Sequence, residues 1–143
     1  MIYQSLDKSH SQLIAQLFST DLPDGWKQNL LEDAFDSGRF IAFGALNGQE
    51  LVGVITLDVS FETADLEDIV VKKQFRKKGV ATELLKMAEK QLKESGVCKI
   101  FLEVRDSNQT AINFYFKNGF EQISTRKSYY SDGENALVML KEI

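Results

Sequence analysis

Short apolar runs bounded by turn-forming residues recur along the chain, and this pattern is typical of β-strands. Seven segments have it, at residues 2–6, 39–46, 50–59, 64–72, 97–104, 120–126 and 135–141. Between the second and third segments stands Asn47-Gly48, a dipeptide that favours a tight hairpin turn. The run at 97–104 is apolar enough to predict a buried strand.

Apolar residues three or four positions apart predict helices in the remaining segments. Two helices are expected early in the chain, one around Leu13–Phe18 and one from Trp26 to Phe35, which Gly38 would end. The segment Thr20–Gly25 holds the only proline, Pro23, and predicts the turn between them. A long helix is expected from Val80 to Lys93. Its apolar face would consist of Val80, Leu84, Leu85, Ala88 and Leu92.

A shorter helix at residues 109–118, ended by Gly119, completes the predicted order β-α-α-β-β-β-α-β-α-β-β. Strands and helices mixed in this way indicate an α/β (α+β) fold with a largely antiparallel sheet and helices on both faces. At 143 residues, with no linker or repeat, the chain is expected to form a single domain spanning residues 1–143.

Composition narrows the class of protein. The chain is 43% hydrophobic, so a domain of this size can bury a core without disulfides or metals. The formal net charge of −4 argues against a dedicated nucleic-acid binder, and an acidic surface would tolerate a basic peptide or polyamine. Cys98 and His10 are the only cysteine and histidine, so no disulfide forms within the chain and no metal site is expected.

The ends and apolar runs of the sequence bear on localisation. The first residues lack the basic and apolar regions of a signal peptide. No apolar run approaches the roughly 20 residues of a membrane span. We therefore expect a cytoplasmic protein with no membrane partner, either a monomer or a homodimer.

The loop before the long helix has the composition of a phosphate site. Arg76, Lys77 and Lys78 supply positive charge, and free N–H groups at a helix N-terminus suit an anion. Gly79 would let a phosphate approach the main chain, and the small Ala81 would keep the first turn open. The alternative is a solvated basic turn. The spacings of a P-loop and of a dinucleotide-binding loop are both absent.

Glu103 and Tyr115, which both follow this helix in the sequence, could transfer protons. Glu103 interrupts the apolar run at 97–104, and a buried carboxylate is costly unless it is paired or used. Burial would raise its pKa toward the range of a general base. The alternative is a salt bridge to Arg105 or Arg126. In the next helix, capped by Ser107 or Asn108, the Tyr115 hydroxyl could protonate a leaving group, or Tyr115 could be an ordinary aromatic at the core edge. Cys98, at the start of the strand, is expected in the core.

Arg76-x-x-Gly79-x-Ala81 resembles the Gln/Arg-x-x-Gly-x-Gly/Ala signature of the GCN5-related N-acetyltransferase (GNAT) superfamily. The segment from Leu102 to Phe120 and Arg126-x-x-Tyr129-Tyr130 are similar to the N-terminal protein acetyltransferases of the ribosomal-protein alanine (RimI) type. The resemblance runs from about Leu66 to Met139. It implies the GNAT fold, a mixed, mostly antiparallel sheet of six to seven strands with about four helices on its two faces and central strands that splay around the cofactor.

The resemblance implies roles for individual residues. Glu103 matches the general base, and Tyr115 matches the general acid that protonates the coenzyme A thiolate. Backbone groups of Ile69 and Val71 would hold the pantetheine arm and the thioester, and Asn108 would hydrogen-bond the cofactor. The full set expected to bind acetyl-CoA is Ile69, Val71, Arg76, Lys77, Lys78, Gly79, Val80, Ala81, Thr82 and Asn108.

Four further residues are expected near the acceptor. Glu67 and Asp68 add acids to the strand before the basic loop, where other superfamily members carry the base, so either is an alternative to Glu103. Tyr129 and Tyr130 fall between the last two strands and are expected to line the acceptor groove, or else to pack as surface aromatics on the sheet edge.

The resemblance implies an acetyl-CoA-dependent N-acetyltransferase in which a primary amine attacks the thioester directly, without an acyl-enzyme. The expected acceptor is the N-terminal α-amine of a protein. One alternative is a small amine, such as a polyamine or an aminoglycoside, which the acids at Glu67 and Asp68 would suit. Another is a coenzyme A-binding sensor without catalytic activity, against which the presence of both Glu103 and Tyr115 argues.

Overall fold

The computed structural model describes residues 1–22 and 25–143. Of the predicted turn at Thr20–Gly25, Pro23 and Asp24 lie outside the described residues, and Thr20 and Asp21 close the first helix. The strands are β1 (Ile2–Leu6), β2 (Phe40–Asn47), β3 (Glu50–Ser60), β4 (Thr63–Val71), β5 (Lys99–Arg105), β6 (Glu121–Arg126) and β7 (Ala136–Glu142). The α-helices are α1 (Ser11–Asp21), α2 (Gln28–Asp36), α3 (Val80–Glu94) and α4 (Gln109–Lys117). The predicted order of strands and helices is confirmed.

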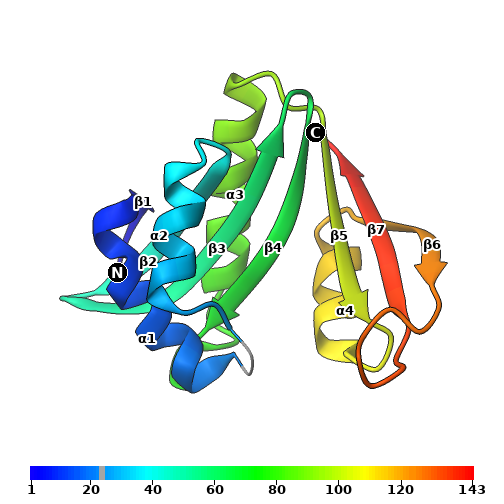
Figure 1. Cartoon of the computed structure of the whole chain (residues 1–143), viewed down its shortest axis with the longest axis horizontal. Coiled ribbons are helices and arrows are strands. Elements are labelled where there is room, and N and C mark those ends of the chain that lie inside the picture. The colour runs from blue at the N-terminus through cyan, green and yellow to red at the C-terminus, as the bar shows by residue number, and fades with distance from the viewer. Residues whose placement is uncertain (23–24) are drawn as a thin grey trace.

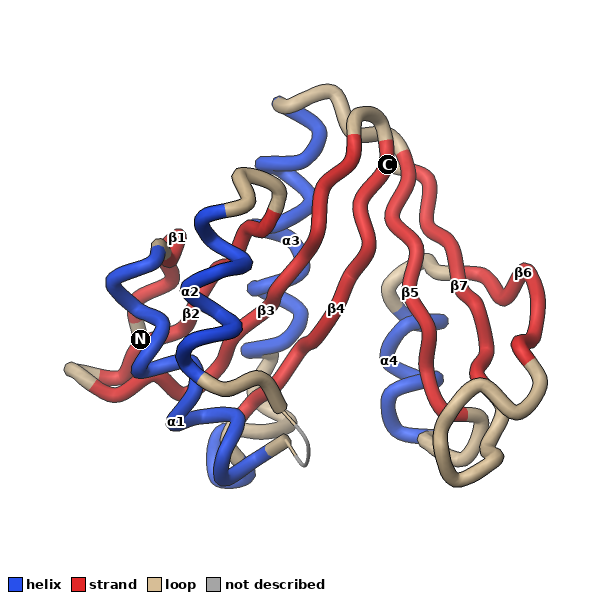
Figure 2. Tube along the Cα trace, viewed as in Figure 1, coloured by secondary structure: helices blue, strands red, loops and turns tan. Residues whose placement is uncertain are grey.

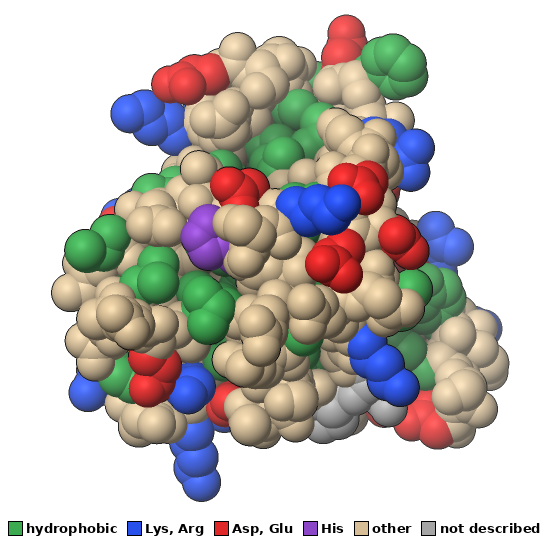
Figure 3. All heavy atoms as spheres, turned by 60° about the vertical axis from the view of Figure 1, so that its left-hand side comes forward, with side chains coloured by type: hydrophobic (Ala, Val, Ile, Leu, Met, Phe, Trp, Pro, Cys, Tyr) green, Lys and Arg blue, Asp and Glu red, His purple; other side chains and the backbone are tan. Residues whose placement is uncertain are grey.

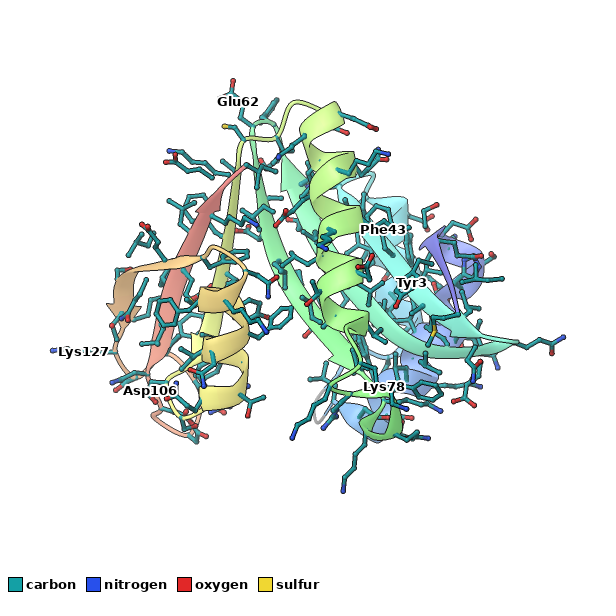
Figure 4. All side chains as sticks on the ribbon, turned by 180° about the vertical axis from the view of Figure 1, so that it is seen from behind. Tyr3, Phe43, Glu62, Lys78, Asp106 and Lys127 are labelled. Atoms are coloured by element: carbon teal, nitrogen blue, oxygen red, sulfur yellow. The ribbon has the colours of Figure 1, made fainter. Side chains whose placement is uncertain are left out.

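The seven strands form one sheet in the order β1-β2-β3-β4-β5-β7-β6. Every neighbouring pair is antiparallel except β4 and β5. Helices α1 and α2 cover one face of the sheet, and α3 and α4 cover the other (Figure 1, Figure 4). The predicted GNAT fold, a mostly antiparallel sheet between helices, is therefore confirmed.

The hairpin predicted at Asn47-Gly48 joins β2 and β3. Asn47 pairs with Glu50, so the two loop residues are Gly48 and Gln49, one position later than the dipeptide signal. Gly48 has a φ of 65°, which a glycine at the first loop position of a hairpin adopts without steric cost.

The long helix α3 buries the face that its spacing predicted. Val80, Leu84, Leu85, Ala88 and Leu92 are all buried, and they pack in one core with residues of β3, β4, β5 and α4. A second core lies under α1 and α2. Trp26 was expected in the second helix. It instead precedes α2 and stacks on Phe40, with ring centroids 5.6 Å apart.

The feature that shapes the sheet is the short pairing between β4 and β5. Only three pairs join these parallel strands, the last being Asp65 with Phe101. Beyond that point β4 stays paired with β3 as far as Val71, and β5 stays paired with β7 as far as Arg105. The two halves of the sheet therefore diverge, and the gap widens toward the ends of β4 and β5 (Figure 2).

A β-bulge in β4 lies where the strands part. Thr56 of β3 pairs with Asp68 and the next residue, Leu57, pairs with Leu66, so Glu67 is an extra residue without a cross-strand partner. A bulge bends its strand and increases the local twist. The bulge at Glu67 therefore turns β4 away from β5 directly after their last pair.

The strand predicted to be buried at 97–104 is buried on one face only. In β5, Ile100, Leu102 and Val104 are buried toward α3 and α4, whereas Lys99 and Glu103 are exposed. The other face of β5 is open because α1 and α2 contact β2, β3 and β4 instead. A strand is buried on both faces only where helices cover both. Cys98, expected in the core, is exposed as well.

The face that carries β1, α1 and α2 has charges of both signs scattered over it, without a patch of one sign, and the single histidine lies among them (Figure 3). Across residues 1–22 and 25–143, no helix is long and apolar enough to cross a membrane.

Gly53 sets how closely α3 approaches the sheet, which makes it a test of this packing. A Cβ at Gly53 would lie 2.9 Å from Cγ1 of Val80, the first residue of α3. We expect Gly53→Ala to lower the free energy of unfolding by about 1–3 kcal/mol, because the β-branched Val80 cannot rotate away. Urea unfolding measures this loss.

Gly44→Ala in β2 is the matched control. A Cβ there meets the flexible ends of Leu51 and Leu6, which can move aside. A loss in Gly44→Ala as large as that in Gly53→Ala would contradict the account of α3 packing.

Candidate functional site

The edge of β4 that faces the gap presents backbone groups that no neighbouring strand among the described residues pairs. The Lys72 N–H donates to the Val52 carbonyl at 2.8 Å, which makes these two residues a hydrogen-bonded pair of the antiparallel ladder. Such pairs alternate along antiparallel strands. Ile69 and Val71 therefore direct their N–H and C=O groups away from β3, into the gap. The Val71 carbonyl accepts from Nε of Arg76 at 2.8 Å, which is consistent with this direction.

A cavity of about 840 Å³ lies between α3, α4 and this edge; we call it the α3–α4 cavity. It brings together nearly all residues predicted to bind acetyl-CoA. Those that line it are Ile69, Val71, Arg76, Lys77, Gly79, Val80, Ala81, Thr82 and Asn108. Lys78 does not line it, and its Nζ lies 5.8 Å from the centroid of the Phe75 ring instead. Lys78 lies shortly before α3 and Asp106 shortly before α4, on the two sides of the wide end of the gap between β4 and β5 (Figure 4).

The N-terminus of α3 forms a cradle for an anion. Gly79 is the N-cap residue with a φ of 83°, and no side chain caps the helix there. The first-turn N–H groups therefore face the cavity without a side-chain acceptor. A Cβ at Gly79 would meet no atom within 4 Å, so the approach to the main chain is open. The basic side chains of Arg76 and Lys77 complete a site that fits a phosphate group.

Tyr115 and Asn108 reach the same cavity from α4. Asn108 is the N-cap of α4, and its Oδ1 accepts from the Ala111 N–H at 3.2 Å. The Tyr115 side chain is 9% exposed and packs against Phe120. Burial, and secondly the charge of Asp68, raise the pKa of Tyr115. The hydroxyl therefore carries its proton at neutral pH and can donate it.

Several residues of the α3–α4 cavity were not among those predicted to bind the cofactor. They are Asp21, Leu22, Phe75, Thr110, Ala111, Phe114 and Lys117. Oδ1 of Asp21, at the end of α1, accepts from the Lys73 N–H at 3.3 Å and lies 3.7 Å from Nη2 of Arg76. Because about fifty residues separate Asp21 from this loop, only the folded chain brings them together.

A second cavity of about 510 Å³ contains three carboxylates, from Asp65, Glu67 and Glu103; we call it the acidic cavity. Its other lining residues are Leu66, Phe101, Leu102, Arg126, Tyr129, Tyr130 and Val138. The structure thus brings together four predicted residues, Glu67, Glu103, Tyr129 and Tyr130. Asp68, which pairs across from Thr56, does not line this cavity.

Glu103 is held by two side chains of the acidic cavity. Its Oε2 lies 3.0 Å from Nε of Arg126, and its Oε1 accepts from the Tyr129 hydroxyl at 3.4 Å. The expectation of a buried Glu103 is wrong, since its side chain is 32% exposed on the face of β5 that no helix covers. The alternative of a salt bridge to Arg126 is confirmed. Arg105 binds Asp132 and Glu134.

The two other carboxylates of the acidic cavity repel negative charge. Burial raises the pKa of Glu67, and the charges of Asp68 and Asp65 raise it further. Burial also raises the pKa of Asp65, and the negative charges of Asp58 and Glu103 raise it further. Because a positive charge would relieve this repulsion, the cavity favours a cationic ligand such as an amine.

The two cavities lie on opposite faces of β5. Leu102 and Val104 point toward α4, which carries Tyr115, so the alternate residue Glu103 points to the other side. The gap between β4 and β5 joins the two sides. The arrangement places the Glu103 carboxylate on one side of the gap and the Tyr115 side chain on the other. In the part of the chain that the structure describes, no group of three or more His, Cys, Asp or Glu side chains is placed to hold a metal ion.

Comparisons with known proteins agree with this geometry. The sequence profile of the Acetyltransferase (GNAT) family matches residues 9–120. The chain is 31% identical over 139 residues to the [ribosomal protein bS18]-alanine N-acetyltransferase of Salmonella typhimurium, which covers 88% of this chain and 94% of that one. The corresponding enzyme of Escherichia coli has a solved structure that matches 99% of this chain and 93% of its own with a TM-score of 0.89 and 25% identity.

An archaeal relative matches a shorter segment more closely. The N-alpha-acetyltransferase of Sulfurisphaera tokodaii is 43% identical over 72 residues, which is 50% of this chain. The match spans less than half of that relative, 43% of its length.

Asp68 provides a test of the electrostatics near the gap. Burial raises its pKa from 3.8 to about 6, so the folded protein binds this proton more tightly than the unfolded chain. Ionisation of Asp68 therefore costs stability, and the loss develops as the pH rises from 3.8 to about 6. We expect Asp68→Asn to be more stable than wild type at neutral pH by up to about 3 kcal/mol.

The measurement is chemical unfolding of both proteins across this pH range, in which the difference should vanish below pH 3.8. Asp106→Asn, at an exposed carboxylate, controls for the loss of one charge. A constant difference at all pH values would contradict the burial of an ionisable Asp68.

Proposed function

Because the chain belongs to the Acetyltransferase (GNAT) family, we propose that it transfers the acetyl group of acetyl-CoA to the N-terminal α-amine of a protein. The observation that carries this proposal is the gap between β4 and β5, which has an anion cradle on one side and a carboxylate-lined cavity on the other. The names of its relatives, an N-alpha-acetyltransferase and a ribosomal-protein-alanine N-acetyltransferase, support the choice of acceptor.

The residues of the α3–α4 cavity fit acetyl-CoA. The N–H groups of Val80, Ala81 and Thr82 and the side chains of Arg76 and Lys77 would bind the pyrophosphate. The free edge of β4 at Ile69 and Val71 would bind the amide-containing pantetheine arm as an added strand would be bound. The Val71 N–H then lies where it can donate to the thioester carbonyl oxygen as negative charge develops there. Bound acetyl-CoA supplies the activated acetyl carbon.

The acidic cavity is proposed to receive the acceptor. Glu67 stands on the bulge at the mouth of the gap, and its charge attracts an ammonium group. Tyr129 and Tyr130 form an aromatic wall with ring centroids 5.1 Å apart. An acceptor that enters between these groups presents its amine to the gap from the side opposite Tyr115.

Glu103 is the proposed proton acceptor. An α-amine has a pKa of about 7.7–8.0, far below the roughly 10.4 of a lysine side chain, so its deprotonation demands less of a base. The ion pair with Arg126 and the contact with Tyr129 fix the orientation of the Glu103 carboxylate. Exposure of Glu103 to solvent allows a water molecule to relay the proton.

Tyr115 is the proposed proton donor. Its raised pKa keeps the hydroxyl protonated, and its place in the wall of the α3–α4 cavity puts it on the side from which the thiolate departs. Direct attack of the amine on the thioester then needs one base and one acid, on opposite faces of β5. No covalent enzyme intermediate is involved.

The experiment that tests this function offers acetyl-CoA and a set of amines to the protein and identifies the products by mass spectrometry. The set contains a peptide with a free N-terminal alanine, the same peptide blocked at the N-terminus but containing lysine, spermidine and an aminoglycoside. Acetylation of the free α-amine supports the proposal. Acetylation of spermidine or the aminoglycoside alone would assign the acidic cavity to small polycations. Coenzyme A binding without any product would favour a sensor.

Tyr115→Phe removes the proposed proton donor and keeps the ring. We expect kcat at neutral pH to fall about 100-fold, a typical contribution of general acid catalysis, while the Kd for coenzyme A stays nearly unchanged. Steady-state kinetics and calorimetry measure the two quantities. Tyr3→Phe, in β1 at the far side of the sheet, is the matched control. Near-wild-type turnover by Tyr115→Phe would show that another group protonates the thiolate.

Glu103→Gln and Glu67→Gln make the same change at two positions of one cavity. We expect Glu103→Gln to lower kcat about 100-fold, because the amide cannot accept the proton. We expect Glu67→Gln to raise KM for the acceptor with a smaller change in kcat, because the substitution removes only the electrostatic attraction between Glu67 and the ammonium group of the acceptor. A larger fall in kcat in Glu67→Gln than in Glu103→Gln would move the role of base to β4.

A further inference from the structure

The loop between β6 and β7 (residues 127–135) carries the two tyrosines of the acidic cavity, and it is anchored to the neighbouring loop between β5 and α4 (residues 106–108). The Asp106 N–H donates to the Asn135 carbonyl at 3.1 Å. Within the β6–β7 loop, the Tyr130 N–H donates to the Glu134 carbonyl at 3.2 Å. One loop forms a wall of the acidic cavity, and the other leads into α4, which carries Tyr115.

Arg105, the last residue of β5, makes three contacts with the β6–β7 loop. Its Nη1 donates to Oδ2 of Asp132 at 2.8 Å and to Oε2 of Glu134 at 3.0 Å. Its Cζ lies 4.0 Å from the centroid of the Tyr130 ring. A guanidinium group can donate within its plane and stack with its face at the same time, which a lysine ammonium cannot do. Arg105 therefore fixes the position of Tyr130 relative to β5.

Glu134 continues these contacts toward α4. Its Oε1 accepts from the Ser107 N–H at 3.0 Å and from the Ser107 hydroxyl, while Oε2 binds Arg105. Ser107 directly precedes Asn108, the N-cap of α4 and a wall residue of the α3–α4 cavity. The hydrogen bonds from Ser107, and then Arg105, lower the pKa of Glu134, so it stays ionised at neutral pH.

The contacts of Arg105 are expected to add little to the stability of the fold. The side chains of Arg105 and Asp132 are 40% and 58% exposed, and exposed ion pairs contribute little to the free energy of unfolding. What the contacts do determine is geometry, because they join a wall of one cavity to a wall of the other through three side chains.

We propose that Arg105 is a positioning residue that, through Glu134 and Ser107, links the Tyr129–Tyr130 wall of the acidic cavity to the start of α4, so that acceptor and coenzyme A bind with positive coupling. The inference rests on the proposed function and extends it, because it states how the two substrate sites communicate. Because these contacts join the two walls, a ligand that holds one wall in its bound position also holds the other wall for the second ligand.

The test measures binding without turnover. Coenzyme A is titrated calorimetrically into the protein alone and into the protein saturated with a peptide amide that carries a free N-terminal alanine. We expect the peptide to tighten coenzyme A binding to wild type by at least about fivefold, the lower end of measured couplings. We expect Arg105→Lys to bring this factor close to one, because lysine keeps the charge but not the stacked, two-acceptor geometry.

Arg39→Lys is the matched control, since Arg39 forms an exposed ion pair with Asp58, at 3.5 Å, and lines neither cavity. It should keep the wild-type coupling. Glu134→Gln is a second variant that removes the link from the other end and should also lose the coupling. Thermal unfolding of each variant close to wild type shows that the fold is retained. In steady-state kinetics, Arg105→Lys should raise KM for the peptide more than it lowers kcat.

The outcomes separate this inference from the proposed function. If wild type acetylates the peptide but shows no coupling, or if Arg105→Lys keeps the coupling of Arg39→Lys, the inference is wrong and the proposed function stands. If wild type does not acetylate the peptide, the proposed function fails for this acceptor and the inference fails with it.

Discussion

The site depends on the early separation of two parallel strands, β4 and β5, after only three paired residues. A central strand that lacks a neighbour leaves backbone N–H and C=O groups unpaired, which is costly when they are buried away from water. Here the backbone groups of Ile69 and the Val71 N–H face the α3–α4 cavity, while the Val71 carbonyl accepts from Nε of Arg76. The bulge at Glu67 bends β4 away from β5 at the point of separation. Beyond this point the two halves of the sheet, as far as the structure describes them, are not joined by hydrogen bonds. The unpaired backbone groups of β4 therefore remain available to bind a ligand.

The two faces of the split sheet have complementary electrostatics. On the helical face, the N-terminus of α3 and the nearby basic residues favour an anion, as the phosphates of coenzyme A require. On the other face, the carboxylates of Asp65, Glu67 and Glu103 favour a cation, as an approaching amine requires. Under the proposed function the reacting groups would meet in the gap, and the opposite charges would bring the two substrates there from opposite sides.

Much of this arrangement could be predicted from the sequence because it is local. The buried face of α3 follows from helical spacing, and the anion cradle follows from Gly79 and the basic residues before it, of which Arg76 and Lys77 line the cavity. The exposure of Glu103 could not be predicted, because an apolar run does not reveal which face of its strand lacks a helix. The bulge at Glu67 could not be predicted either, because no residue type marks it. The place of Asp21 beside Arg76 depends on contacts across the fold.

Hydrogen exchange of the Ile69 and Val71 amides, followed by NMR with and without acetyl-CoA, tests the central claim most directly. The account predicts that both amides exchange readily in the free protein, because they point into the gap rather than toward β3. Acetyl-CoA should protect both, while the Val70 amide, which faces β3, should be protected in either state. Slow exchange at Ile69 and Val71 without ligand, or no change on adding acetyl-CoA, would contradict the claim that this edge of β4 binds the substrate.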